Sequence, residues 1–172
     1  LTDTSAYVMQ FVGPPFTFSI RQVGSNCGAI GQHSIVYANG AVYWMGQSGG
    51  FFVYDGTVKT LPCLVEDFVF TTGGDNLGLN FESGEIVYAG YNNLYSEINW
   101  FYPKLSPPVV NTKSSTNYGE NVWTTGSLDR TTYYDATLFD NPYATQFNST
   151  GTPSFPTING VTNINGSTIY YA

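Results

Sequence analysis

Short aromatic runs separated by glycine turns most strongly constrain what this chain can fold into. In residues 42–56, VYWMGQSGGFFVYDG, two such runs flank a Gly-Gly pair, and a second turn follows at Asp55-Gly56. Aromatic and β-branched side chains suit a pleated, half-buried surface, and Gly-Gly or Asp-Gly pairs supply the positive φ of tight hairpins. The stretch therefore predicts consecutive antiparallel strands.

Alternation along these two runs predicts that both faces of the sheet are covered. Successive side chains of a strand point to opposite faces. Trp44 then opposes Tyr43, and Phe51 opposes Tyr54, so that both faces are apolar. A blade packed between two other blades requires such a sheet. We expect these aromatic side chains to serve mainly in packing.

The same kind of run recurs along the whole chain and predicts an all-β, antiparallel fold with short strands and little or no helix. Residues 109–118 and 127–141 are rich in Thr, Tyr or Ser, which favours strand and loop over helix. The other expected strands are 16–23, 33–40, 41–46, 50–56, 58–70, 84–92, 95–103, 120–126 and 167–172.

The rhythm of strands and turns repeats imperfectly, with a period of about 40–50 residues, which is typical of β-propeller blades. Residues 1–172 are therefore expected to be part of one β-propeller-like domain, a partial propeller of four-stranded blades. The chain begins without Met and ends within an apparent strand, IYYA. Both termini accordingly look truncated relative to a longer chain.

Charge and cysteine content narrow the possible functions. The chain has 5 basic and 12 acidic side chains, a formal charge of −7, which disfavours nucleic-acid binding through phosphate contacts. No run is long enough to span a membrane. Cys27 and Cys63 could form a disulfide on count alone, but two buried free thiols are expected. With a single histidine, His33, no zinc site is expected.

The sequence offers few candidates for catalysis. A glycosidase would need Glu97 to face a second carboxylate, for which Asp55 and Asp129 are the candidates. The alternative, that Glu97 and Asn99 satisfy exposed or interface backbone groups, is favoured, and no enzymatic activity, metal or cofactor is expected. Arg130 follows Asp129 directly, and we expect it either to form a defined contact at a subunit interface or to tie two strands of one blade.

Three stretches carry a resemblance to a known family. Residues 12–63 contain a Cys-Gly pair at 27–28 followed by VYWMG and FFVYDG, residues 95–103 read YSEINWFYP, and residues 117–144 contain NVWTTGSLDRTTYYD. In this order and spacing they resemble the propeller-containing neck and tail proteins of short-tailed bacteriophages, the packaged-DNA stabilisation or nozzle proteins. The resemblance covers residues 11 to about 145.

The resemblance implies a structural protein of the virion, assembled in the host cytoplasm. It implies a ring, commonly of six copies, that lies below the portal and adaptor rings and extends the channel which retains and delivers packaged DNA. No catalytic residue is implied. Two rival hypotheses remain, a carbohydrate-binding or glycan-degrading tail propeller and a capsid-decorating module. Candidate structural or interface residues are Trp44, Tyr54, Glu97, Trp100, Trp123 and Arg130.

Overall fold

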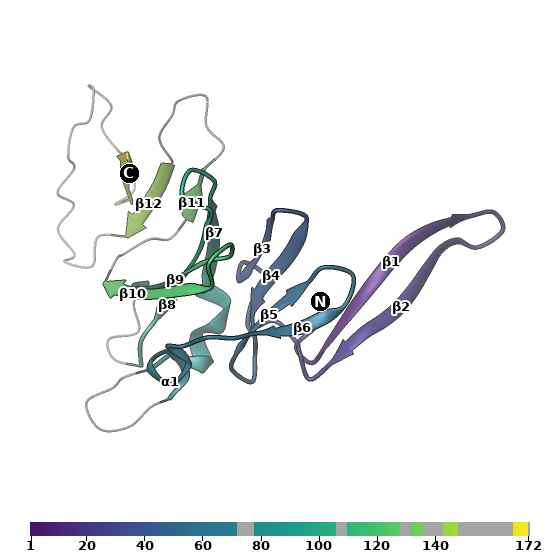
Figure 1. Ribbon diagram of the computed structural model, residues 1–172, viewed down its shortest axis with the longest axis horizontal. Coiled ribbons are helices and arrows are strands. Elements are labelled where there is room, and N and C mark those ends of the chain that lie inside the picture. Colours follow the sequence, from purple (N-terminus) through teal and green to yellow (C-terminus); the bar gives the residue numbers. More distant parts are fainter. Residues whose placement is uncertain (72–77, 106–109, 128–131, 136–142, 148–166, 172) are drawn as a thin grey trace.

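The computed structural model describes residues 1–71, 78–105, 110–127, 132–135, 143–147 and 167–171. Strands dominate these residues, and every strand pair is antiparallel, which confirms the all-β prediction. The strands form a hairpin and three further sheets, arranged along the chain one after another (Figure 1). In this described part, no helix has the length and hydropathy that crossing a membrane requires.

The first and second large sheets are four-stranded meanders in which consecutive strands are neighbours. The first contains β3 (Ile35–Ala38), β4 (Ala41–Met45), β5 (Phe51–Tyr54) and β6 (Val58–Leu61). The second contains β7 (Tyr88–Asn92), β8 (Glu97–Pro103), β9 (Val110–Asn117) and β10 (Val122–Ser127). A third sheet joins β11 (Thr132–Tyr134), β12 (Tyr143–Phe147) and β13 (Ser167–Tyr171).

The first strands of the three sheets lie side by side. β7 packs beside β3 on one side and beside β11 on the other. These strands begin at Ile35, Tyr88 and Thr132, so the repeat lengths are 53 and 44 residues, close to the period expected from the sequence. Neighbouring inner strands are the arrangement found in propeller blades. The described residues form no closed ring of blades.

Turn chemistry explains why the first sheet is a meander. Asn39 and Gly40 join β3 to β4 with φ of 47° and 79°, and Ala38 pairs with Ala41 across this turn. Two successive positive φ angles define a type I′ turn, whose twist matches that of the strands it joins. β4 and β5 are joined by the longer loop of residues 46–50, in which Gly49 and Gly50 also have positive φ, of 93° and 81°, and Gly46 N donates to Gly50 O at 2.9 Å.

Two expected strands are shorter than predicted. The strand expected over 58–70 ends at Leu61, because Pro62 cannot donate to the strand ladder, and a short helix, α1 (Glu66–Phe70), follows. The strand expected over 84–92 begins at Tyr88, after a 3₁₀ helix, η1 (Phe81–Ile86). The Asn80 side chain accepts a hydrogen bond from Glu82 N at 3.1 Å and so caps η1.

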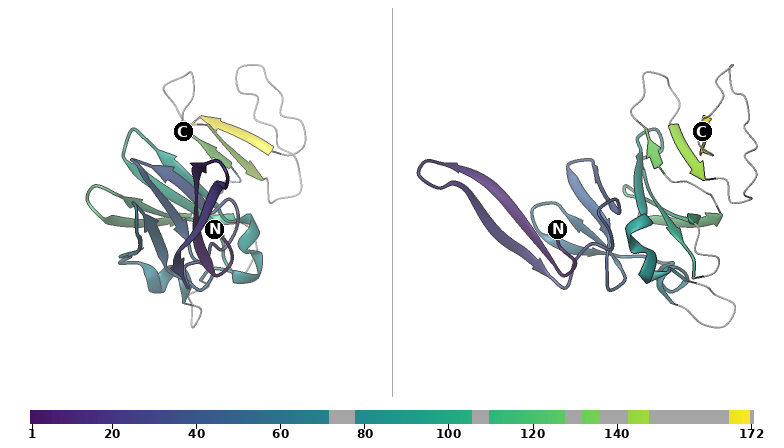
Figure 2. Two further views of the ribbon diagram at one scale, coloured as in Figure 1. Left: turned by 90° about the vertical axis from the view of Figure 1, so that its right-hand side faces the viewer. Right: turned by 180° about the vertical axis from the view of Figure 1, so that it is seen from behind.

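A long hairpin at the N-terminal end is the largest departure from the sequence prediction. β1 (Ser5–Gly13) was not expected as a strand, and it pairs along its length with β2 (Thr17–Ser25). The hairpin projects away from the three sheets in Figure 1 and again in the right view of Figure 2. Only its base contacts the first sheet, where Ala6 and Val23 pack near Trp44.

Candidate functional site

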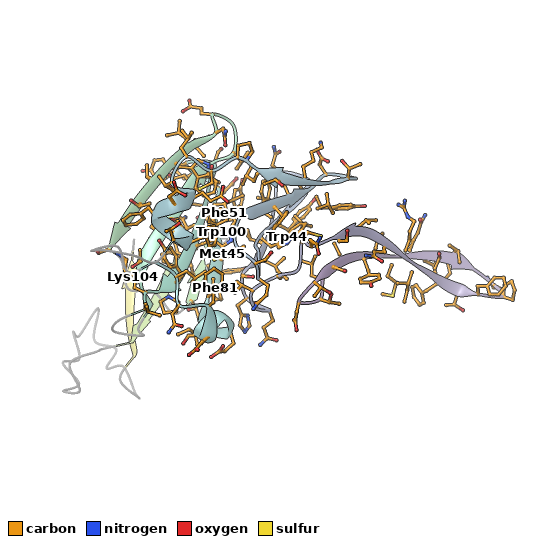
Figure 3. All side chains as sticks on the ribbon, turned by 90° about the horizontal axis from the view of Figure 1, so that it is seen from below. Trp44, Met45, Phe51, Phe81, Trp100 and Lys104 are labelled. Atoms are coloured by element: carbon orange, nitrogen blue, oxygen red, sulfur yellow. The ribbon has the colours of Figure 1, made fainter. Side chains whose placement is uncertain are left out.

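The interior between the first and second sheets is built around three aromatic rings. Phe51 of β5 lies 4.7 Å, centroid to centroid, from both Trp100 of β8 and Trp123 of β10. The two indoles stack at 6.0 Å with an interplanar angle of 16°. Figure 3 shows Phe51, Met45 and Trp100 close together between the sheets. The second sheet therefore supplies the two stacked indoles, and the first sheet supplies the ring that packs against both of them.

Each indole N–H in the chain also bonds to a carbonyl oxygen outside its own sheet. Trp100 Nε1 donates to Ser34 O at 3.1 Å, just before β3, and Trp123 Nε1 donates to Pro62 O at 2.8 Å, just after β6. Both ends of the first sheet are thus tied to the second sheet. A buried indole usually finds such a partner, since an unpaired buried donor is costly.

Trp44 packs on the other face of the first sheet, where it joins this sheet to the N-terminal segment. Its Nε1 donates to Cys27 O at 2.8 Å, and its ring stacks on Phe52 at 5.7 Å. Tyr54 lies half-buried at the edge of this cluster, which Ala6 and Cys27 cover from the N-terminal segment. All three tryptophans are buried, as packing residues should be, since they are 0%, 0% and 7% exposed in chain order. Their role at an interface between subunits stays a prediction.

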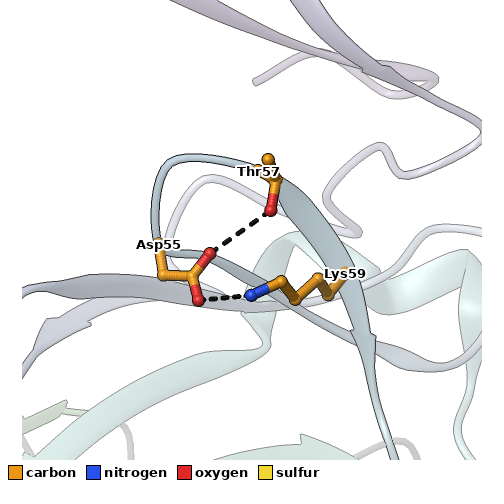
Figure 4. A network of polar contacts seen from close by, with 3 residues as sticks. All are labelled: Asp55, Thr57 and Lys59. Atoms are coloured by element: carbon orange, nitrogen blue, oxygen red, sulfur yellow. Dashed lines mark hydrogen bonds and ion pairs between the residues drawn. The ribbon is translucent and has the colours of Figure 1, made fainter.

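Glu97 begins β8 and is half-buried, and its backbone lies between Asn92 of β7 and Asn117 of β9. Asp55, its first candidate carboxylate partner, belongs to the turn of the first sheet that joins β5 to β6. There Asp55 binds Lys59 Nζ at 2.6 Å and accepts a hydrogen bond from Thr57 Oγ1 at 3.4 Å (Figure 4). The hydrogen bond from Lys59 lowers the pKa of Asp55. Asp55 is therefore already paired within its own turn.

Asn99 bonds to a side chain of the neighbouring strand. Its Oδ1 accepts a hydrogen bond from Ser115 Oγ at 2.6 Å across β8 and β9. Both residues are buried. The Ser115 hydroxyl and the Asn99 carbonyl oxygen therefore satisfy each other inside the second sheet.

A tyrosine cluster, which the sequence analysis did not identify, lies where the first and second sheets meet. Tyr91 and Tyr118 share a hydrogen bond between hydroxyls at 3.0 Å, and Tyr43 lies 6.5 Å from Tyr118, ring to ring. The hydrogen bond with Tyr118 raises the pKa of Tyr91 to about 12, and hydrogen bonding, first from Ser96, lowers the pKa of Tyr118. Nothing local in the sequence marks this cluster, because its members come from three separate strands and turns.

The two cysteines are free thiols, as expected. Cys27 is buried, whereas Cys63 is only partly buried, which corrects the expectation that both are buried. Burial nevertheless raises the pKa of Cys63 to about 11. The two thiols belong to separate clusters, Cys27 beside Trp44 and Cys63 against the core between the first and second sheets.

The described residues include no group of three or more His, Cys, Asp or Glu side chains that could hold a metal ion. His33 lies in a turn, where its ring stacks on Tyr88 at 5.9 Å and its Nε2 lies 3.1 Å from Gln32 Nε2. Arg130 and Asp129 lie outside the described residues, so their predicted contacts stay predictions.

The described site is therefore a packing contact between sheets. Indole rings and their N–H groups form most of this contact, and a polar tyrosine cluster lies at its edge. The residues expected from sequence to be structural divide accordingly. Trp44, Trp100 and Trp123 are central to the packing, while Tyr54 and Glu97 lie at its margins. Comparison with models of known protein families gives no match, and comparison with curated proteins finds no similar sequence.

Proposed function

We propose that this chain is a structural component of a bacteriophage virion, part of the tail or neck nozzle that extends the portal channel. One structural observation supports this most directly. Two four-stranded meanders stand beside each other with adjacent first strands, and Trp100 and Trp123 lock the second to both ends of the first. Such serial, mutually packed sheets suit a part that bears load. The strand sequences VYWM, FFVY and EINWFYP, which carry part of the resemblance to the nozzle-type proteins, lie in them.

The charge distribution fits a channel through which DNA slides. Four of the acidic residues, Glu66, Asp67, Glu82 and Glu85, are exposed on or near α1 and η1. These two elements are neighbours, because Leu79 N donates to Val69 O at 2.7 Å and the rings of Phe70 and Phe81 lie 6.2 Å apart. An acidic wall repels a polyanion and avoids the affinity that a basic groove gains by counterion release.

In this proposal the chain acts in a ring, six copies by resemblance to the nozzle-type proteins, and contacts the portal or adaptor ring and other tail proteins. Packaged DNA passes through the ring without specific binding. The chain has no enzymatic activity in this role and lies in the neck or tail of the particle.

The test is to locate the chain in whole particles. Purified virions labelled with an antibody fragment against this chain are imaged and averaged around the vertex that carries the tail. Six-fold density of the label at that vertex supports the nozzle role. Label spread evenly over the shell contradicts it and favours a capsid-decorating module, whereas release of reducing ends from host polysaccharide by the purified chain favours a glycan-degrading tail propeller.

A further inference from the structure

The outer end of the N-terminal hairpin is apolar and exposed. Residues 11–18, FVGPPFTF, comprise the turn between β1 and β2 and the strand residues next to it, and six of these eight are apolar. We call these six the apolar tip: Phe11, Val12, Pro14, Pro15, Phe16 and Phe18. All six are exposed, and the four that are not proline are 51–80% exposed. Large apolar side chains gathered in this way mark a surface that another body covers.

The apolar surface continues from the tip along one face of the hairpin. Met9 lies opposite Ile20 in the strand register, on the same face as the Phe11–Phe18 pair, and both are exposed. Phe11 and Phe18 meet edge to face at 5.7 Å. The hairpin projects away from the three sheets (Figure 1, and the right view of Figure 2), so this surface is presented well outside the body of the described chain.

Polarity increases toward the base of the hairpin and on its other face. Gln10 pairs with Ser19 on that face, directly behind the tip. Arg21 pairs with Val8, also on that face, and lies roughly 10 Å further from the end of the hairpin than the Phe11–Phe18 pair, at about 3.3 Å per residue. No charged residue occurs between Asp3 and Arg21. The hairpin is therefore graded along its axis, from an apolar, uncharged end to a polar base.

We propose that the apolar tip and the adjoining face of Met9 and Ile20 insert into the interfacial layer of a lipid bilayer. Segments that dock in this layer bury an apolar face to a depth of about 5–10 Å and keep polar and basic side chains on the other face. The tip matches this depth, since the chain from Phe11 to the turn extends roughly 10 Å. Arg21 then lies at the level of the headgroups, where a guanidinium group can bind phosphate.

The gradient along the axis selects a lipid surface rather than a second protein. A protein laid against one face of the hairpin would cover Met9 and Ile20 but leave Phe16 and the two prolines of the turn in water. A bilayer surrounds an inserted end from every direction, and a hairpin that leans toward it also buries the adjoining face. Phenylalanine is among the side chains that interfacial segments place between headgroups and acyl chains.

Backbone chemistry limits the depth of insertion. The two outer edges of a hairpin carry N–H and C=O groups without strand partners, and such groups cannot enter hydrocarbon away from water without a large cost. Insertion of the end alone keeps most of them among hydrated headgroups. The net charge of −7 also sets the body of the chain against anionic lipids, so binding depends on apolar area rather than on charge.

This inference goes beyond the nozzle role and does not depend on it. Its test mixes the purified chain with phosphatidylcholine vesicles and follows flotation on a density gradient as the lipid concentration rises. The wild-type chain should float with the vesicles, and replacing part of the lipid by phosphatidylglycerol should not strengthen its binding. The double variant Val12→Thr/Phe16→Ser removes apolar surface from the tip without altering a cross-strand pair, and it should weaken binding by about tenfold or more.

The matched control is Leu94→Thr/Tyr95→Ser, because these two residues are similarly exposed, at 73% and 62%, but lie in the turn between β7 and β8. It should float like wild type. Phe16→Trp places an indole at the tip, and its emission should shift to the blue with vesicles and be quenched by brominated acyl chains. The wild-type chain, in which all three tryptophans are buried, should show neither change.

A wild-type chain that does not float at any lipid concentration overturns the inference. So does flotation that the tip variant leaves unchanged, or emission of Phe16→Trp that vesicles do not shift. Self-association without flotation, abolished by the tip variant, would assign the tip to a second copy of the chain and also overturn the lipid contact. The virion role is judged separately: a chain that floats through its tip yet lies evenly over the shell keeps the lipid contact and contradicts the nozzle.

Discussion

Trp123 donates its indole N–H to the carbonyl oxygen of Pro62 at 2.8 Å, and this bond joins the last strand of the second sheet to the end of the first. The two residues are 61 positions apart in sequence. Together with the stacking of Trp123 on Trp100, the bond makes the contact between the sheets both apolar and directional. A slide of one sheet over the other would break it.

Trp123→Ala should therefore lower the free energy of unfolding by about 3–5 kcal/mol, because it removes a large buried ring from the core. Trp123→Phe keeps most of the ring but leaves the Pro62 carbonyl without its donor, and should cost about 1–3 kcal/mol. Urea unfolding followed by circular dichroism measures both. Tyr95→Phe, at a tyrosine that is 62% exposed, serves as the control and should change stability by less than about 0.5 kcal/mol. Equal stabilities for Trp123→Phe and wild type would show that the hydrogen bond contributes nothing.

A second prediction concerns the base of the hairpin. Gly28 lies against the backbone of Asp3 and Thr4, and a Cβ at this position would overlap the Asp3 carbonyl group. Gly28→Ala should displace the N-terminal segment and cost about 1–3 kcal/mol, since a backbone neighbour cannot rotate away as a side chain can. Gly126→Ala is the matched control, because a Cβ at Gly126 meets nothing within 4 Å. Urea unfolding and limited proteolysis near the hairpin would measure the difference, and equal behaviour of the two variants would contradict the close packing.

The sequence predicted the two-faced packing of the first sheet correctly, since the alternation of side chains is a local property of any strand. Trp44 and Tyr43 lie on opposite faces in separate clusters, and so do Tyr54 and Phe51. The partners of these faces could not be predicted in this way. The carbonyls of Ser34 and Pro62 are reached by Trp100 and Trp123 only after the second sheet has packed, and no periodicity encodes that contact.

The incorrect predictions had signals that were available in the sequence. Residues 66–70, EDFVF, are the end of the strand expected over 58–70, although two acidic residues at the start of a segment favour the first turn of a helix. β1 was missed although Tyr7, Met9 and Phe11 alternate with Val8 and Gln10 ahead of a Gly-Pro-Pro turn.

A third prediction follows from the raised pKa of Cys63. With a pKa of about 11 in place of 9.0, the folded chain should hold about 100-fold less thiolate at this position than the unfolded chain at about pH 8. Alkylation by iodoacetamide, located by peptide mass spectrometry, should be slower at Cys63 in the folded chain by about that factor. Rapid alkylation of Cys63 without unfolding would contradict the burial of its thiol.

The same shift predicts how stability depends on pH. The folded chain binds the Cys63 proton more tightly than the unfolded chain, so the stabilisation is complete below pH 9 and is lost as pH rises through about 11. The Cys63→Ala variant lacks this dependence. The difference in unfolding free energy between wild type and Cys63→Ala should therefore change over this interval and stay constant below it.

The last prediction tests whether the acidic surface keeps DNA from binding. Because the chain has a charge of −7, its dissociation constant for double-stranded DNA at physiological salt should exceed about 0.1 mM. That affinity is weaker than the usual range of non-specific binding. Reversing Glu66, Glu82 and Glu85 to Lys adds six charges and brings the net charge to −1. These three side chains are exposed, so the change should leave the fold intact and create a local basic surface that binds DNA and loses affinity as salt rises.

Fluorescence anisotropy of labelled DNA measures this binding, and the matched control is the triple Gln variant, which removes the three negative charges without adding positive ones. The dissociation constant of the Gln variant for DNA should also be about 0.1 mM or higher, since this variant has gained no cation to replace the counterions of the phosphates. In phage carrying the Lys variant, DNA delivery should be slower than in wild type, because cations that hold phosphates oppose sliding. Micromolar binding of DNA by the wild-type chain would contradict a channel wall that repels DNA, and equal delivery by the Lys variant would place α1 and η1 away from the channel.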